Sequence, residues 1–584
     1  MSLSIICTAT TTTPPSIPLE GGAFDASNDE GFGRSVARPS QLCQLLNATP
    51  TPFLLTQKGP GEKAGTTESH RQGHITSPGA PGCLFQGIYT GDRRRPDTSM
   101  SASPHHSPIN IWFPISLLFS PAFLNEVILV FIEHFSTQFQ EISSESNIAA
   151  MAPKNRVIID SDPGIDDVMA MLLALSASPE ELEVMMISVT YGNVPLQSCL
   201  KNVVALFHVL EKEIAWRKEN GKPEGFESLK AYKPIVSVGA EHALEDDELA
   251  ADYFHGLDGL HGVHEKHPHL SPDDRWQSLF HTEKNVDHDP SPFNQYFTPA
   301  KQVAHKEILR ILKENEPNTI SICVVGPMTN VALAAAEDPE TFLRVKELCV
   351  MGGAVHVEGN ITPHGEFNTV ADAVAAARVF ALTSPTPRST MPPISDKKSS
   401  LPPYPARLSK KLKLTLFPLD ITTPHLLRKN YFTETIKPIV ASGSPLGQWV
   451  NHFMSKCFDK IIEMEGDGQE PGLSLHDPLT VWYLLTQSDP KWKATAEPED
   501  IRIETTGQWT RGMHVIDRRL RVKYNEAALE ASETGDAVDV LTLAEVPGDT
   551  GGWLSTSRGN RVNRMVESPG EDLFAPDLMK RVFG

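Results

Sequence analysis

Short apolar runs alternate with longer amphipathic segments from about residue 151 onward. The run 157–159 is short and β-branched, which is typical of a buried strand, and the apolar run 168–175 suits a helix packed on a sheet. Further strands are predicted at 183–190, 235–238, 319–325, 348–351 and 412–420. Helices are predicted at 198–213, about 301–314, 331–336 and about 444–465. This alternation predicts an α/β fold with an open, mostly parallel sheet flanked by helices.

The first 150 residues lack this alternation. They are rich in Ser, Thr, Pro and Gly, and no amphipathic period persists, so we predict that most of residues 1–150 form a disordered extension. Met151 directly precedes the first predicted strand and reads as a natural start. We therefore hypothesise that residues 1–150 are a gene-model extension or a dispensable tail. Peptides from upstream of Met151, found by N-terminal mapping in cells, would exclude the first alternative.

One apolar stretch, residues 111–132, interrupts this extension. Its length is sufficient to span a bilayer, which needs about 20 apolar residues. However, Pro114, Pro121, Asn125 and Glu126 interrupt it, and it lies too far from the N-terminus for an ordinary signal peptide. A membrane anchor is therefore the less favoured interpretation, and we expect no stable membrane insertion.

Residues 151–584 are predicted to form one domain with two insertions. Residues 264–297 carry many His, Pro and Asp without a clear period, and residues 383–411 are Pro-rich and partly basic. Both insertions are expected to be surface loops. The sequence leaves open whether the second loop packs on the core.

Charge and cysteine content narrow the classes of function. The chain has 52 Lys and Arg against 73 Asp and Glu, a formal net charge of -21, which argues against a nucleic-acid binder because such a protein needs a basic face. The seven cysteines form no CxxC pair and their number is odd. Free thiols in a reducing compartment are expected, which favours a cytoplasmic enzyme.

Four carboxylates lie within residues 160–167, hereafter the acidic turn, between the first predicted strand and the first predicted helix. Pro163 and Gly164 favour a tight turn there. A single Asp at a helix start is usually an N-cap, which could explain Asp166 but not four carboxylates. Like charges this close repel unless a positive charge lies among them. Oxygen ligands suit a hard cation, and a Ca²⁺-like ion fits best.

Other polar or glycine-rich stretches follow predicted strands in the same way. Asn193, Gly326 and Gly352 each come just after a strand, as the acidic turn does. The carboxyl ends of parallel strands meet at one edge of a sheet, and ligands gather there. We therefore expect these residues to lie close to the acidic turn.

The acidic turn resembles the N-terminal signature of the inosine–uridine-type nucleoside hydrolases. Further matches follow in the family's order, over about residues 155–545: Gly192-Asn193, Gly326-Pro-Met-Thr-Asn330, Met351-Gly-Gly353, Gly359-Asn360, Glu366-Phe-Asn368 and His476-Asp477-Pro. A lone Asp-x-Asp motif would be weak evidence for this family, because glycosyltransferases and phosphatases also contain it. The resemblance implies a Rossmann-like sheet and an enzyme that cleaves ribonucleosides, purine or pyrimidine, into ribose and base.

The resemblance also implies a set of metal ligands. Asp162, Asp167, Asp477 and the backbone carbonyl of Val325 are expected to hold Ca²⁺. Three carboxylates supply enough negative charge for a tight hard-cation site. Asp162 is further expected to be the general base, taking a proton from a metal-bound water that attacks C1′.

The remaining matched residues are expected to bind the substrate. The implied ribose-binding set is Asp166, Asn193, Asn360, Glu366 and Asn368. His476 is expected to protonate or orient the leaving base, and Asp160 to support the turn from behind. Glu366 and Asn368 alternate as if on an extended segment, and Asn330 reads as a helix cap outside the site.

A loop at 254–262 resembles one near the family's active site, where a similar His-Gly and Asp-Gly pair occurs. Its spacing departs from the common form, so the sequence assigns no roles to His255 and Asp258. Two alternatives to the hydrolase stay open: a metal-dependent phosphohydrolase, and a ribose- or nucleoside-binding protein without turnover. The sequence does not indicate base preference. A homodimer or homotetramer is expected from the resemblance.

Overall fold

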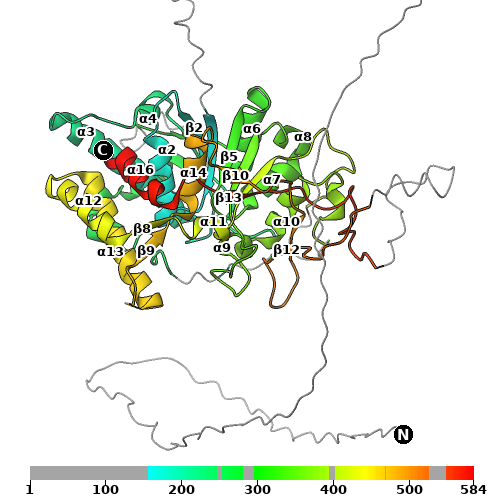
Figure 1. Ribbon diagram of the computed structural model, residues 1–584. Coiled ribbons are helices and arrows are strands. Elements are labelled where there is room, and N and C mark those ends of the chain that lie inside the picture. Colours follow the sequence, from blue (N-terminus) through cyan, green and yellow to red (C-terminus); the bar gives the residue numbers. More distant parts are fainter. Residues whose placement is uncertain are drawn as a thin grey trace, which may run out of the picture. The chain divides into compact units, whose positions relative to one another are not determined.

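A nine-stranded sheet runs through the computed structural model (Figure 1). Its strand order is β10-β13-β7-β6-β5-β1-β2-β3-β4, and every pair is parallel except β10 with β13. The strands are β1 (Asn155–Ser161), β2 (Leu182–Val189), β3 (Ile235–Val238), β4 (Thr298–Pro299), β5 (Ile320–Val324), β6 (Glu347–Met351), β7 (Leu414–Phe417), β10 (Lys493–Ala494) and β13 (Asn563–Glu567). The predicted mostly parallel sheet is confirmed.

The structure describes residues 155–245, 249, 253–280, 295–393, 401–466, 468–524 and 548–584. The predicted disordered extension, residues 1–150, and its apolar stretch 111–132 lie outside these residues. Among the described helices, none is long and apolar enough to cross a membrane. Four cysteines are described, all buried free thiols: Cys199, Cys323, Cys349 and Cys457.

Helices cover both faces of the sheet (Figure 1). One face carries α2 (Ile165–Leu175), α3 (Leu196–Glu219), α12 (Lys429–Ala441), α13 (Pro445–Glu465), α14 (His476–Thr486) and α16 (Glu571–Phe583). The other carries α6 (Ala304–Glu314), α7 (Thr329–Glu337), α8 (Pro339–Phe342) and α10 (Ala373–Ala381). Each face has its own apolar core because side chains alternate along a strand: Val157 and Ile159 join the first core, and Ile158 joins the second.

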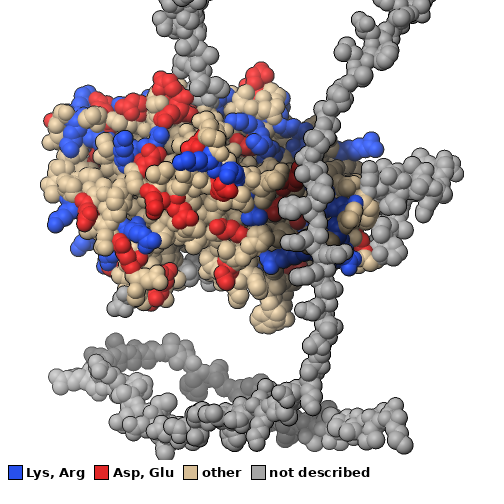
Figure 2. Space-filling view, in the orientation of Figure 1, with Lys and Arg blue, Asp and Glu red and all other residues tan. Residues whose placement is uncertain are grey.

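Shorter elements complete the described part of the chain. They are α4 (Glu227–Ala231), α5 (Val263–Lys266), α9 (Phe367–Ala371), α11 (Leu419–Thr422), the strand pair β8 (Leu426–Arg428) and β9 (Gly472–Ser474), and the pair β11 (Ile501–Ile503) and β12 (His514–Ile516). On the face shown in Figure 2, acidic and basic side chains are interspersed.

Two predictions of local structure are corrected. The strand predicted at 412–420 ends at Phe417, because Pro418 precedes the short helix α11. The extended segment predicted through Glu366 and Asn368 is wrong. Glu366 caps α9, its side chain accepting the backbone N–H groups of Asn368 and Thr369, so Asn368 lies in the first helical turn.

The described parts of both insertions pack against the rest of the chain. Within 264–297, residues 264–280 include short helical turns and bury Trp276, while 281–294 lie outside the described residues. Within 383–411, Tyr404 is only 1% exposed, and the Arg378 guanidinium lies 5.1 Å from its ring centre. The second insertion therefore packs on the core through Tyr404, although residues 394–400 are not described.

Candidate active site

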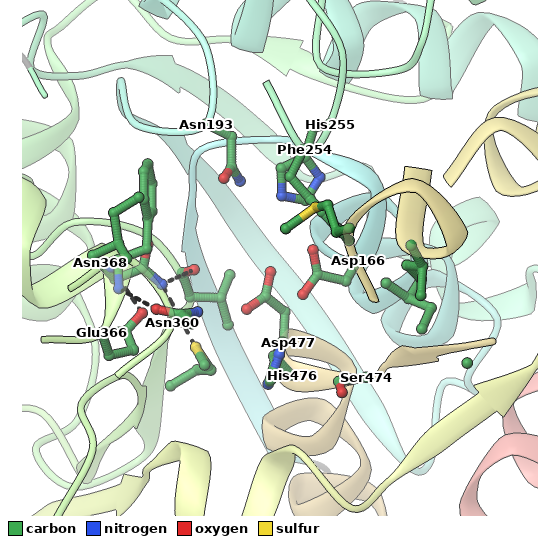
Figure 3. Close-up of a pocket in the computed structure, with 18 of the residues that line it drawn as sticks. Asp166, Asn193, Phe254, His255, Asn360, Glu366, Asn368, Ser474, His476 and Asp477 are labelled. Atoms are coloured by element: carbon green, nitrogen blue, oxygen red, sulfur yellow. Dashed lines mark hydrogen bonds between the residues drawn. The ribbon is translucent and has the colours of Figure 1, made fainter. Parts of the chain in front are cut away.

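A cavity of about 240 Å³ opens beyond the carboxyl ends of the strands. β1 is flanked in the sheet by β2 and β5, and β5 by β6, so the segments after these four strands meet there. Polar residues, all buried or half-buried except the exposed Asn360, line one part of it: Asp166, Asn193, His255, Asn360, Glu366, Asn368, His476 and Asp477 (Figure 3). Apolar side chains, hereafter the apolar rim, line another part: Phe254, Ile361, Phe367, Ile461 and Met464. The predicted gathering of loops at this edge is confirmed.

Asp167 is held by its own turn and by the segment after β2. The hydroxyl of Ser161 donates to its Oδ1 at 2.6 Å, and the Gly164 N–H donates to its Oδ2 at 3.0 Å. The Asn193 side-chain amide donates to the same Oδ2 at 3.0 Å. With three donors, the carboxylate has one fixed orientation before any ligand binds.

Asp162 is fully buried directly beneath the cavity but is not among the residues that line it. Its Oδ2 accepts the Asn193 N–H at 2.7 Å, whereas its Oδ1 has no hydrogen-bond partner among the described residues. A Cβ at Gly192 would lie 2.0 Å from Oδ2, and a Cβ at Gly326 would lie 2.5 Å from Oδ1. Both positions therefore require glycine, because any larger side chain would displace the carboxylate.

Asp160 supports the turn from within the sheet. Its Oδ1 accepts the Ser188 hydroxyl at 2.5 Å and the Asn330 side-chain amide at 2.9 Å. The Asn330 side-chain oxygen in turn accepts the Ala240 N–H at 2.8 Å. Asn330 lies inside α7, so the prediction of a helix cap is wrong. The residue ties the helix to β1 and to the segment after β3.

The electrostatics of these carboxyl groups point to a cation. Burial raises the pKa of Asp160 to about 7, and burial together with the Asp167 charge raises the pKa of Asp166 to about 8. Burial and the neighbouring carboxylates raise the pKa values of Asp162 and Asp477 well above their usual range. Among the described residues, none of these groups forms an ion pair with Lys or Arg. A bound cation would supply the missing positive charge.

The closest grouping of potential metal ligands differs from the predicted set. Ligand atoms of Asp166, Asp167 and Asp477 all lie within 4.8 Å of one another. In Figure 3 the carboxylates of Asp166 and Asp477 extend into the same space. Asp162 was expected among the ligands, but it is not in this close grouping and does not line the cavity. Val325, the fourth predicted ligand, lines the cavity, and its carbonyl accepts the Asn368 side-chain amide at 2.8 Å.

The predicted ribose-binding residues line the cavity from three segments: Asp166 follows β1, Asn193 follows β2, and Asn360, Glu366 and Asn368 follow β6. The Glu366 carboxylate is occupied by protein donors: Gly353 N–H at 2.8 Å, Asn368 N–H at 2.8 Å, and the Thr369 N–H and hydroxyl at 3.0 Å each. It fixes the start of α9, which places the Asn368 amide. The Asn360 side-chain oxygen accepts the Phe367 N–H at 2.9 Å.

Two histidines reach the cavity from different elements. His476 begins α14, beside Asp477, and burial lowers its pKa to about 4. His255 comes from the 254–262 loop, to which the sequence assigned no role. The Ile165 N–H donates to its Nδ1 at 3.0 Å, and burial, reinforced by His261 and His476, lowers its pKa to about 3. Both rings are therefore neutral near pH 7.

Asn202 joins this loop to the acidic turn, and sequence reasoning missed it. Its side-chain amide donates at 2.9 Å to the carbonyls of Pro163 and Asp258, and its oxygen lies 2.8 Å from His264 Nε2. The Asp258 carboxylate accepts N–H groups of its own loop, including that of Gly262 at 2.9 Å. Asn202 lies on the buried face of the amphipathic helix α3, and a polar residue on that otherwise apolar face was the available signal.

The chain is similar to known proteins over most of its described residues. The family model described as inosine-uridine preferring nucleoside hydrolase matches residues 157–545. The pyrimidine-specific ribonucleoside hydrolase RihA of Klebsiella pneumoniae is 29% identical over 361 residues, covering 62% of this chain and 88% of that protein. The non-specific ribonucleoside hydrolase RihC of the same species is 26% identical over 375 residues, covering 64% and 92%. A purine-preferring ribonucleoside hydrolase structure from Gardnerella vaginalis has 19% identity and a TM-score of 0.47, covering 73% of this chain and 98% of that one.

Proposed function

This chain belongs to the inosine-uridine preferring nucleoside hydrolase family and is a nucleoside hydrolase, and we propose that it cleaves the N-glycosidic bond of ribonucleosides with Ca²⁺ as its cofactor. The observation that carries the proposal is the arrangement of the cavity: buried, unpaired carboxyl groups at one part and an apolar rim at another. A nucleoside has the same division, since its ribose carries hydroxyl groups and its base has an apolar face.

The donor set fits a hard cation. Asp166, Asp167 and Asp477 offer oxygen atoms within 4.8 Å of one another, and Asp162 has a buried Oδ1 without a partner. We propose Asp162, Asp167, Asp477 and the Val325 carbonyl as the Ca²⁺ ligands, with a small rotation of side chains bringing Asp162 into the set. When bound, the cation would lower the pKa of water and neutralise the carboxylates.

Asp162 is proposed as the general base. Its Oδ2 is held by the Asn193 N–H, and its Oδ1 is free to accept a proton from the attacking water. Water forms the new bond to C1′ as the C1′–N bond breaks, and the electron pair of that bond leaves with the base. The sugar passes through an oxocarbenium-like state, which the surrounding carboxylates stabilise.

Asp166, Asn193, Asn360 and Asn368 are proposed to bind the ribose hydroxyls. All four line the cavity and offer amide or carboxylate groups, which match hydroxyl donors and acceptors. Glu366 was predicted in this set, and we now propose that it acts mainly by capping α9. The apolar rim is proposed to bind the base through its aromatic and aliphatic side chains.

The alternative phosphohydrolase is disfavoured by the cavity itself. Among the described residues that line it, none is Lys or Arg, and a transferring phosphoryl group needs such positive charge in addition to a metal. A binding protein without turnover is disfavoured because Asp162, Asp167 and Asp477 are all present. Buried free thiols in the described residues support the predicted cytoplasmic location.

The test uses the full chain, stripped of divalent cations with a chelator. Inosine and uridine are supplied without phosphate, and released ribose is measured as reducing sugar before and after Ca²⁺ or Mg²⁺ is added. We expect release only with added cation, with Ca²⁺ more effective than Mg²⁺. No ribose from either nucleoside with Ca²⁺ present, or strict dependence on phosphate, would overturn the proposal.

A further inference from the structure

The ring of His476 is held from behind by Thr422. The Thr422 Oγ1 lies 2.7 Å from His476 Nδ1. Thr422 is the last residue of α11 and is fully buried. Its hydroxyl has no other hydrogen-bond partner among the described residues. Sequence reasoning missed this residue, because the two partners are 54 residues apart and nothing local marks the contact.

The single partner decides the direction of this hydrogen bond. If Nδ1–H donated to Oγ1, the buried hydroxyl hydrogen would have no acceptor, which costs free energy. If the hydroxyl donates to Nδ1, both groups are satisfied. A neutral imidazole has one protonated nitrogen, so the ring proton then lies on Nε2.

The bond to Thr422 leaves the protonated nitrogen as the one available to a ligand in the cavity. His476 lines the cavity, and Nδ1 is turned to Thr422 in the protein interior, so Nε2 is the nitrogen left for a ligand. Nε2 has no hydrogen-bond partner among the described residues. The His476 ring therefore offers a hydrogen-bond donor, not an acceptor, to a ligand in the cavity.

The backbone around Thr422 fixes this arrangement. The His425 N–H donates to the Thr422 carbonyl at 3.1 Å, and the Leu475 N–H donates to the His425 carbonyl at 2.8 Å. These bonds join the end of α11 to the residue just before His476. The hydroxyl and the ring are therefore held together by main-chain bonds and do not depend on a flexible side chain.

We propose that Thr422 is a positioning residue that holds His476 in the Nε2–H tautomer, so that the ring donates a hydrogen bond to the departing base. This inference rests on the proposed nucleoside hydrolysis. As the C1′–N bond breaks, its electron pair moves to the base nitrogen, and the Nε2–H group stabilises the charge that develops there. The proton stays on Nε2. The water that attacks C1′ gives its proton to Asp162, and the base takes its final proton from solvent.

The test compares substrates whose leaving groups differ in whether they need a hydrogen-bond donor to depart. Thr422→Val keeps the shape of the side chain and removes the hydroxyl, whereas Thr422→Ser keeps the hydroxyl. We expect Thr422→Val to lower kcat for inosine and uridine about 100-fold, because one donor to a developing charge is lost, with KM changed less than about threefold. The same variant should leave kcat for p-nitrophenyl β-D-riboside within about threefold of wild type, because nitrophenolate leaves without a donor. Thr422→Ser should restore activity on nucleosides.

Two controls separate this role from a structural one. Thr415→Val changes a buried threonine on the neighbouring strand β7 and should leave both substrates unaffected. In a His476→Ala background, Thr422→Val should have no further effect on nucleosides. Thr422→Ala serves the same comparison if the valine variant is not recovered in folded form.

The outcomes distinguish the two proposals. Wild-type protein that releases no ribose from nucleosides would overturn the proposed function. Active wild type with a Thr422→Val variant that is unchanged, or that loses both kinds of substrate equally, would overturn the role of Thr422 alone. Failure of Thr422→Ser to restore activity would also overturn it.

Discussion

Asp167, in the acidic turn, accepts two hydrogen bonds from its own turn and one from the segment after β2, whereas Met464, on the apolar rim, is 57% exposed at the end of α13. The turn is fixed by the sheet before a ligand arrives, while the rim is carried by helix ends and loops. Groups held in fixed positions suit catalysis, because no free energy is spent on reorienting them during the reaction. Exposed apolar groups suit recognition of a base, because they can adjust to its shape. Substitutions in the two regions should therefore have different kinetic effects.

The largest effect is expected from removing one charge beneath the cavity. Asp162→Asn should lower kcat about 10⁴-fold, the upper end for loss of a general base, while the protein stays folded. Asp160→Asn is the matched control, since Asp160 is equally buried but its Oδ1 is held inside the sheet by Ser188 and Asn330, and it should cost less than about tenfold. Steady-state kinetics on both variants measure the two losses in kcat. Equal losses would remove the distinction between base and support.

A second prediction concerns stability without cation. In stripped protein, the raised pKa values of Asp160, about 7, and Asp166, about 8, mean that the folded state binds more protons than the unfolded state. The stabilisation from the protonated carboxyls is present below pH 4 and is lost as pH rises to about 8. For Asp160 alone this is on the order of 4 kcal/mol, or roughly 5 °C in melting temperature for a domain of this size.

Calcium should reduce this pH dependence, because a cation held by Asp167 and Asp477 would lie close to the Asp166 carboxylate and stabilise its ionised form. Thermal melts with chelator and with Ca²⁺, at pH 5 and at pH 8, measure the difference. The prediction would be contradicted if the difference in melting temperature between the Ca²⁺-bound and the stripped protein were no larger at pH 8 than at pH 5.

The third prediction concerns the space around Asp162. Gly326→Ala should lower kcat about 100-fold, because its Cβ would lie 2.5 Å from Oδ1 and displace the carboxylate. Gly468→Ala is the matched control, since a Cβ there would meet nothing within 4 Å. Kinetics and melting temperature are measured for both. A fully active Gly326→Ala would show that the position of Asp162 is not critical.

The smallest effect is expected at the apolar rim. Met464→Ala should raise KM about fivefold, equivalent to about 1 kcal/mol of lost apolar contact, with kcat little changed. Leu573→Ala, on α16, removes a similarly exposed side chain and should have no effect on KM. The ratio of KM values for inosine and uridine reports whether the rim sets base preference. A lower kcat with an unchanged KM would instead show that Met464 contributes to the catalytic step.

Much of the acidic turn could be predicted, because its signals are local. The run at 157–159 lies inside β1, and Pro163-Gly164 marks the turn into α2. The sequence could not show that Asp162 lies beneath the cavity while Asp166 lines it, since that depends on the glycines after β2 and β5. The helix at Glu366 was missed because Glu is not among the usual N-cap residues; its carboxylate caps α9 and is itself held by the Gly353 N–H from the segment after β6.

The rim and the supports behind the site were less predictable for the same reason. Met464 lies at the end of a helix whose existence was predicted, but nothing in the pattern says which end faces the cavity. Asn202 and Thr422 act through partners far along the chain. Such residues look like ordinary members of an amphipathic helix or a turn until the fold is known.

Asp477 comes from the first turn of α14, which packs along α2 and so delivers it to a turn made much earlier in the chain. The ribosome completes β1, β2, β5 and β6 well before it reaches α14. A nascent chain, or a product truncated before α14, therefore carries Asp166 and Asp167 without their third partner. Such a fragment can form part of the sheet and still lack the cation site. Binding of the ion thus marks a chain synthesised at least through the first turn of α14.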